Sequence, residues 1–266
     1  MENTALNQEV NLALYELGLE QVSPIQTEGI NAAFSGAEFF IKTYQPNFRT
    51  RAFRDVWGGN WYNVPTIRPL VQNVIELSEG WSMSIWPLVS ITPVQKCNLD
   101  EMVEILHKLH DQEISPGNRA STDWIESHKN EIPDRHFDHL HEMVEKYHQM
   151  TSGMLLHPVH GDSHAKNFGV HNGRVVLLDW ELTGLEVSEW DWASLTQDDF
   201  SATRARELSL QNRPVLDWIV ATRAFMTVSV HLLYGEPEIA RQKSQGYHKI
   251  LPTKAAQELD RILFDG

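Results

Sequence analysis

A change of pattern near residue 90 constrains the fold more than any other feature of the sequence. Before this point, short segments rich in β-branched and aromatic residues alternate with turn residues, which predicts about five strands. After it, apolar residues recur at helical spacing, as they do over 99–109. A strand-rich first third and a helical remainder predict a bilobal α+β chain. We expect a small N-terminal lobe over 1–88, a hinge at about 86–92 and a larger, mostly helical C-terminal lobe over 89–266.

Individual elements follow from the same periodicities. One extended run over 25–34, a turn at 35–36 and a strand over 39–44 predict a hairpin. Further strands are expected over 71–77, 81–88 and 175–178. Helices are expected over 8–19 and 48–57, from the N-cap residue Asn98 onward, from 122, over 133–149, and from 191 to the end.

Charge and composition narrow the class of protein. The chain has 266 residues with 22 Lys+Arg and 36 Asp+Glu, a formal net charge of −14, which argues against broad nucleic-acid binding and favours a cationic partner or a metal. Cys97 is the single cysteine, so no intrachain disulfide can form. No apolar run is long enough to span a membrane, and the N-terminus lacks the basic segment of a signal peptide. We therefore expect a cytoplasmic protein, monomeric or homodimeric, with no nucleic-acid or membrane partner.

Two short segments in the helical part carry the chemistry. The first, HGDSHAKN, contains Asp162 and, five residues later, Asn167; the second, LLDWE, places Asp179 at the end of the strand expected over 175–178. Phosphoryl transfer needs a carboxylate to orient or deprotonate the acceptor hydroxyl and oxygen ligands for Mg²⁺ on the nucleotide phosphates. These three side chains supply both.

The two segments together resemble the aminoglycoside phosphotransferase/choline kinase family, whose pattern is roughly H-G-D-x-x-x-x-N, an apolar strand and D-W/F-E/D. The resemblance implies a protein-kinase-like fold and transfer of the γ-phosphate of ATP (or GTP) to an alcohol group of a small molecule. It implies that Asp162 is the catalytic base, that Asn167 and Asp179 hold Mg²⁺, and that His160 is a structural residue of the catalytic loop.

The resemblance extends weakly over the first lobe and implies a nucleotide site there. Asn31 lies in a segment similar to the family's nucleotide loop, and Lys42 lies on a strand similar to the one that bears the phosphate-contacting lysine. Asp55 stands where the family usually has a glutamate that pairs with this lysine. Trp86 and Leu88 belong to the expected hinge, whose backbone would meet the adenine edge.

The acceptor is expected to be cationic. Seven acids and no Lys or Arg lie between residues 175 and 203. Such a run is otherwise a solvated face, but beside a metal site it would attract amines. We expect Glu181, Glu186, Glu189 and Trp190 to bind the acceptor. An aminoglycoside or amino sugar comes first, which would make the chain an antibiotic-resistance kinase; choline or ethanolamine is the alternative.

Other classes stay open at this stage. The chain could be a catalytically silent kinase-like module, because Glu28 replaces a glycine of the nucleotide loop and Asp55 is shorter than the usual glutamate. A protein kinase similar to bacterial toxin kinases is a further alternative, although the His160–Gly161 pair does not fit that class.

Simpler explanations also exist for single residues. Lys42 could be a solvated charge on an edge strand. Two groups of histidines could bind a metal. The first is His160 and His164, with Asp162, as in a metal-dependent hydrolase; the second is His136, His139 and His141, as zinc ligands. The second group is more consistent with the solvent-exposed face of a helix. Ser163 lacks the Gly-x-Ser-x-Gly context of a hydrolase nucleophile.

Overall fold

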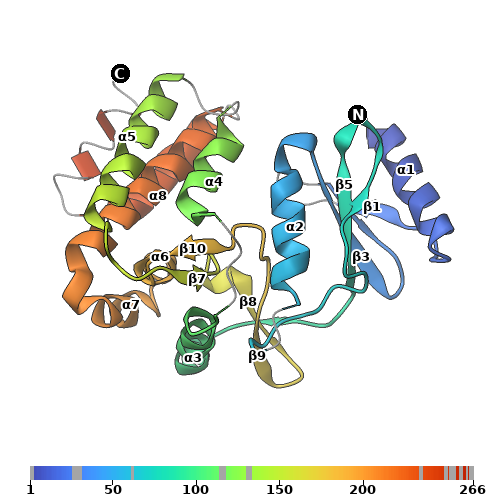
Figure 1. Cartoon of the computed structure of the whole chain (residues 1–266), viewed down its shortest axis with the longest axis horizontal. Helices are drawn as coiled ribbons and strands as arrows, with labels where there is room; N and C mark the ends of the chain where they lie inside the picture. The colour runs from blue at the N-terminus through green and yellow to red at the C-terminus, as the bar shows by residue number, and fades with distance from the viewer. Residues whose placement is uncertain are drawn as a thin grey trace. The chain divides into compact units, whose positions relative to one another are not determined.

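The computed structural model describes residues 3–25, 32–60, 63–113, 118–129, 134–233 and 236–248, with positions 251, 256, 257, 260, 261 and 263. The chain forms two compact units, Met1–Val94 with Lys166–Thr183, and Gln95–Ala165 with Gly184–Gly266. The first contains the five-stranded sheet and the second most of the helices (Figure 1). The expected α+β class is confirmed. The lobe division at residue 88 stays a prediction, and the segment Lys166–Thr183 packs with the first unit.

An antiparallel sheet in the order β1-β2-β3-β5-β4 forms the centre of the first unit. Its strands are β1 (Ser23–Ile25), β2 (Ala33–Ser35), β3 (Phe39–Tyr44), β4 (Ile75–Glu76) and β5 (Ser82–Pro87). The single extended run expected over 25–34 is wrong, since β1 and β2 pair with each other. The strand expected over 71–77 is reduced to β4, because Gln72 and Asn73 interrupt the apolar alternation and lie in a bend.

The period of two in β3 gives the sheet two different faces. Phe39 and Ile41 pack with Leu6, Val10 and Leu14 of helix α1 (Asn3–Glu16). On the other face, Tyr44 packs with Phe48 and Ala52, which belong to the turn η1 (Pro46–Phe48) and helix α2 (Arg49–Gly58). Lys42 has the same parity as Tyr44 and therefore belongs to the face that α2 covers.

A second, three-stranded sheet in the first unit delivers the Asp179 segment. Its order is β6-β8-β9, with β6 at Thr92–Pro93, β8 at Phe168–His171 and β9 at Arg174–Leu177. Asn172 and Gly173 join β8 and β9 with φ values of 51° and 76°, the left-handed backbone of a tight hairpin turn. The strand predicted over 175–178 is thus confirmed, and Asp179 follows it closely.

The second unit is mostly helical, as its sequence periodicity predicts. Its helices are α3 (Leu99–His110), α4 (Ala120–His128), α5 (Asp134–Met150), α6 (Glu189–Leu195), α7 (Ala202–Leu208), α8 (Arg213–Leu233) and α9 (Pro237–His248). Strand β7 (His157–Val159) pairs with β10 (Gly184–Glu186). Asn98 stands at the N-cap position of α3, as expected, but its side chain does not cap this helix. Its side-chain oxygen instead accepts the amide of Gln95, next to the turn η3 (Lys96–Asn98). Among the described helices, none combines the length and apolarity needed to cross a bilayer.

Candidate functional site

Lys42 lies at the centre of a cluster of carboxylates in the first unit. Its Nζ is 2.6 Å from Oδ1 of Asp179, 3.1 Å from Oδ2 of Asp55 and 3.3 Å from Oε1 of Glu181. Burial alone would lower the pKa of the Lys42 ammonium, but the attraction of Asp179 and Asp55 outweighs it and raises that pKa well above its ordinary value. Lys42 is therefore a permanent cation held by three acids, and not the solvated edge-strand charge of the simpler explanation.

Asp55 binds more than the lysine. One oxygen, Oδ2, accepts the Tyr44 hydroxyl at 2.6 Å as well as Lys42, and the other, Oδ1, accepts the backbone amide of Trp180 at 2.9 Å. The carboxylate is fully buried. The two side chains that were predicted to pair do pair, and the shorter aspartate reaches all three donors because α2 packs directly against the Trp180 segment.

Close packing fixes the backbone next to Asp179. Trp180 is fully buried, and its indole Nε1 donates to Oγ1 of Thr66 at 2.9 Å, while Thr66 donates to the Leu177 carbonyl at 2.8 Å. Asp179 itself has φ of 63°, a backbone conformation that non-glycine residues seldom adopt. The surrounding contacts hold this residue in place, with its side chain about two-fifths exposed.

A cavity of about 300 Å³ opens beside this cluster, entirely within the first unit. Polar residues of its lining are Lys42, Asp55, Asn167 and Asp179, and apolar ones include Phe40, Ile67, Trp86, Leu88, Val89, Ile91 and Leu178. The volume falls at the lower end of the range for small-molecule sites, which are mostly apolar with a few convergent polar groups.

The hinge residues line this cavity, but their backbone is partly engaged. The Leu88 amide donates to the Glu38 carbonyl at 2.8 Å, within the sheet, so this N–H is already used there. The Trp86 ring is buried and its Nε1 donates to Ser84. Asn31 and Glu28 lie outside the described residues.

The acids around Lys42 also fit a divalent cation. Asp55, Asp179 and Glu181 each offer a carboxylate oxygen, and these oxygens all lie within 4.8 Å of one another. Burial and the neighbouring Asp179 charge raise the pKa of Glu181 to about 7. Glu181 thus belongs to this cluster, and its role in binding the acceptor stays a prediction. Carboxylate oxygens, with the Asn167 amide on the same cavity, are the hard ligands that Mg²⁺ prefers.

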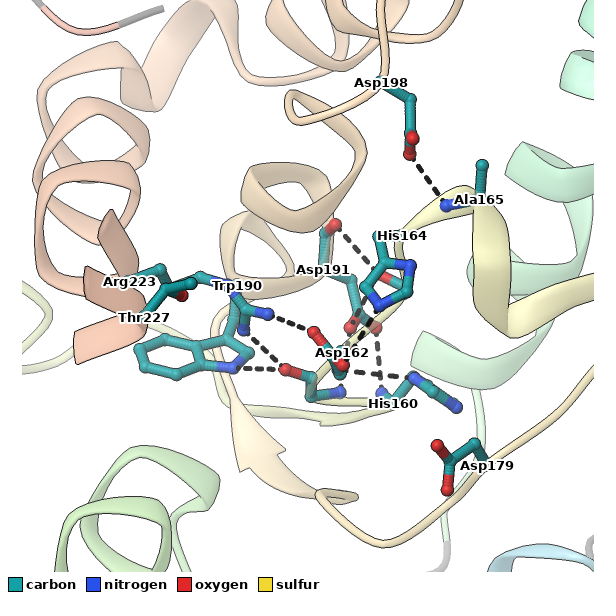
Figure 2. Close-up of polar contacts among 12 residues, drawn as sticks. His160, Asp162, His164, Ala165, Asp179, Trp190, Asp191, Asp198, Arg223 and Thr227 are labelled. Carbon is teal, nitrogen blue, oxygen red and sulfur yellow. Dashed lines mark hydrogen bonds and ion pairs between the residues drawn. The ribbon is translucent and has the colours of Figure 1, made fainter. Parts of the chain in front are cut away.

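In the second unit, Asp191 of α6 organises the HGDS loop (Figure 2). Its buried carboxylate accepts the backbone amides of His160 and Gly161, each at 3.0 Å, and lies 3.0 Å from His110 Nε2. Burial would raise the pKa of Asp191, but the contacts with His110 and His160 lower it below its usual value. Gly161 has φ of 87°, which favours glycine at this position.

Asp162 follows directly, and each of its two carboxylate oxygens has a side-chain partner. Oδ1 accepts a hydrogen bond from Arg223 of α8, and Oδ2 lies 3.3 Å from Nε2 of His164 (Figure 2). Burial would raise the pKa of Asp162, but His164 and Arg223 hold it well below the ordinary range. His160 is buried and its Nδ1 accepts the Asp162 amide at 3.3 Å, a contact that fits a structural residue of the loop.

Three residues expected to bind the acceptor are instead internal. Glu186 is fully buried and accepts hydrogen bonds from Arg119, Ser121 and Tyr147. Glu189 is buried and accepts the side-chain amide of Asn212 at 2.7 Å.

The third, Trp190, is also buried and donates its Nε1 to the Gly161 carbonyl at 3.1 Å. Because Glu186, Glu189 and Trp190 are engaged in this way, we leave them out of the proposed acceptor site. Three of the seven acids in the run, Glu186, Glu189 and Asp191, are buried anchors. Charges along a sequence do not reveal which of them find internal partners.

Among the described residues, His136, His139 and His141 of α5 do not come together as metal ligands. His136 is buried and packs on Phe225 with ring centroids 5.8 Å apart, whereas His141 is exposed and pairs with Glu145. Within the described part of the chain, the His, Cys, Asp and Glu side chains close enough for a metal are those around Lys42. The expected solvent-exposed face is therefore correct for His141 and wrong for His136.

Sequence reasoning missed Arg223 and Tyr44. Arg223 stands in an apolar stretch of α8, IVATRAFM, where a lone arginine must find an internal partner. This is a usable signal, although it does not identify the partner. Tyr44 reads as one more β-forming residue of an aromatic strand, and only the fold places its hydroxyl on Asp55.

Searches for relatives by sequence and by structure gave different results. No family model and no curated protein matches the chain by sequence. Solved structures do match. The protein LicA bound to AMP has a TM-score of 0.64 at 15% identity, over 96% of this chain and 99% of that one.

Two other solved structures also match the chain over most of its length. A choline/ethanolamine kinase family protein from Mesorhizobium loti has a TM-score of 0.58 at 13% identity, covering 97% of this chain and 98% of that one. A thermostable mutant of the aminoglycoside phosphotransferase APH(4)-Ia, in a ternary complex with ADP and hygromycin B, has a TM-score of 0.57 at 11% identity, covering 90% and 97%. The chain therefore has the kinase-like fold that aminoglycoside phosphotransferases share with choline/ethanolamine kinase family proteins, and the resemblance seen in its motifs is confirmed at the level of the fold.

Proposed function

We propose that the protein is a small-molecule kinase that transfers the γ-phosphate of ATP (or GTP) to a hydroxyl group. The observation that carries the proposal is the cluster in the first unit, where Lys42 and Asp55 form an ion pair beside Asp179, on a cavity that Asn167 also lines. A silent module would have no reason to keep Lys42, Asn167 and Asp179 together with Asp162. Solved structures with this fold bind AMP, or ADP together with hygromycin B, which is consistent with a nucleotide donor.

Each side chain has a role in this proposal. Lys42 contacts the nucleotide phosphates through its permanent charge, and Asp55 holds Lys42 in position. Asp179 and Asn167, with Glu181 nearby, would hold Mg²⁺, which when bound supplies charge stabilisation to the phosphates. Asp162, kept ionised by its neighbours, accepts the hydrogen bond and the proton of the acceptor hydroxyl.

We further propose an acceptor that carries amines, an aminoglycoside or amino sugar before choline or ethanolamine. The acid run gives this acceptor little support, since Glu186, Glu189 and Asp191 are buried. Its support is that solved structures with this fold include one bound to hygromycin B and one of the choline/ethanolamine kinase family.

An ADP-release screen against aminoglycosides, amino sugars, choline and ethanolamine with Mg·ATP tests both the kinase activity and the preference for an amine-bearing acceptor. We expect turnover with at least one amine, and a fall in kcat of about 10²- to 10⁴-fold in Asp162→Asn, the usual contribution of a general base. Asp199→Asn is the matched control, because Asp199 is an exposed acid of the same chain region.

The possible outcomes distinguish failure of the kinase proposal from failure of the amine-acceptor proposal. Wild-type turnover in Asp162→Asn would remove Asp162 from the mechanism. A neutral sugar turned over as well as any amine would defeat the amine proposal and leave the kinase standing. Absence of Mg-dependent turnover with every compound would favour the silent module.

A further inference from the structure

Beyond the assignment of Asp162, the geometry points to Arg223 as a positioning residue that sets the orientation of the Asp162 carboxylate toward the acceptor hydroxyl. The inference rests on the proposed kinase function. Arg223 lies on α8, 61 residues after Asp162, and none of the sequence motifs described above includes it. Arg223 acts on the acceptor only through Asp162.

The guanidinium of Arg223 donates hydrogen bonds to two consecutive residues of the loop. Nη1 donates to the Gly161 carbonyl at 2.6 Å, and Nη2 donates to Oδ1 of Asp162 (Figure 2). The group also lies over the Trp190 ring, 5.8 Å from its centroid, and only about 5% of the residue is exposed. A planar guanidinium with divergent N–H groups suits two acceptors in a fixed relation, whereas an ammonium is a single point charge.

The contact with the Gly161 carbonyl locates the guanidinium relative to the backbone. The loop is already fixed on its other side, where Asp191 accepts the amides of His160 and Gly161. The backbone of the loop therefore needs no side-chain contact at Asp162 to keep its path. What the bond from Nη2 adds is a fixed contact on Oδ1, which together with His164 near Oδ2 selects one rotamer of the carboxylate.

Arg223 also sets the charge around Asp162. The titratable groups that face Asp162 are His160 and His164 from its own loop, Asp191 from α6, Arg223 from α8 and Tyr247 from α9. Arg223 is the member of this set that stays cationic at every working pH. It leaves Oδ2, on the His164 side, as the oxygen that can receive an acceptor hydroxyl.

Three variants test the inference in steady-state kinetics. In Arg223→Met we expect kcat to fall about 30- to 100-fold, since displacement of a reacting group by about 1 Å can cost 10²-fold, while the KM for ATP changes less than about twofold. Arg223→Lys, which keeps the charge and loses the fork, should give an intermediate kcat. Arg213→Met is the matched control, because Arg213 lies on the same helix and is paired with Asp217 at the surface.

Carbon-13 NMR of the Asp162 carboxyl, identified by its loss in Asp162→Asn, gives a readout that needs no turnover. An opposite charge in contact lowers a carboxyl pKa by about 1–3 units, so Arg223→Met should move the titration midpoint up by at least about one pH unit. Arg213→Met should leave it in place.

These outcomes separate the inference from the proposed function. If Arg223→Met lowers kcat no more than Arg213→Met does, the inference is wrong and the kinase assignment stands. If the wild-type protein turns over no acceptor, the proposed function fails. If, in addition, Arg223→Met leaves the titration midpoint of the Asp162 carboxyl unchanged, the inference that Arg223 holds Asp162 is wrong as well. Should Arg223→Met not fold, Arg223→Lys decides, and a kcat within about twofold of wild type overturns the inference.

Discussion

Gly58 sets how closely α2 approaches the Trp180 segment. A Cβ built on Gly58 would lie 2.6 Å from the Cβ and Cγ of Trp180, too close for any side chain without a shift of one element. The absence of a side chain at Gly58 is what allows Asp55, one turn earlier on α2, to reach the amide of Trp180. A residue of no chemical function thus helps to position the lysine cluster.

Gly58→Ala should therefore destabilise the protein by about 1–3 kcal/mol, the usual cost of overpacking, although alanine is the better helix former. We also expect a higher KM for ATP, because Asp55 and Trp180 would separate. Gly246→Ala on α9 is the control, since no atom lies within 4 Å of its built Cβ. It should be neutral or stabilise by up to about 1 kcal/mol. Equal unfolding midpoints in urea for the two variants would refute the packing argument.

At the level of elements, Glu186 joins three parts of the second unit. It lies on β10, and its partners are Ser121 of α4, Tyr147 of α5 and Arg119, which precedes α4. Arg119 Nη2 is 2.6 Å from Glu186 Oε2, and Arg119 is about one-quarter exposed. A buried carboxylate with donors from several elements is a structural anchor, because removing its charge leaves those donors poorly matched.

Glu186→Gln should lower the free energy of unfolding by a few kcal/mol, toward the lower end of the 3–5 typical of a broken buried pair because Arg119 retains some solvent. The acceptor KM should stay unchanged. Glu207→Gln, at an exposed pair with Arg204 on α7, should change stability by less than about 1 kcal/mol. Urea unfolding and acceptor kinetics on both variants make the comparison. A raised acceptor KM with unchanged stability would return Glu186 to the acceptor site.

How well sequence predicts an element depends on whether its contacts are local. The amphipathic helices and the strand that delivers Asp179 were predictable, because one buried face imposes its period on the residues themselves. The strand over 71–77 was overestimated, since pairing depends on a partner strand as well as on composition. For the candidate site, the Lys42–Asp55 pair followed from the resemblance. Arg223 on Asp162 and Tyr44 on Asp55 did not, since each pair joins segments whose meeting only the fold determines.

At the scale of the whole molecule, the residues of the proposed reaction divide between the two units. The cavity with Lys42, Asn167 and Asp179 belongs wholly to the first unit, and Asp162 belongs to the second. Nucleotide binding and hydroxyl activation should therefore be separable by mutation. A ligand that binds only the folded state stabilises it by about 2.7 kcal/mol at a concentration 100 times its Kd.

Thermal unfolding with and without Mg·ATP measures this separation directly. Asp162→Asn should keep the full nucleotide-induced rise in Tm, because no lining residue of the cavity is changed. Asp179→Asn should lose most of the rise, since the cluster would lack a charged oxygen for the cation, and Lys42→Met should lose part of it. Asp199→Asn, an exposed acid, controls for the loss of one negative charge. Raising the salt concentration should weaken the rise in wild type but not abolish it, because Lys42 is about one-fifth exposed and a partly buried charge is screened less than a surface charge. If Asp179→Asn keeps the full nucleotide-induced rise in Tm, the nucleotide binds elsewhere and the assignment of this cavity is wrong. This conclusion would not depend on the turnover of Asp162→Asn.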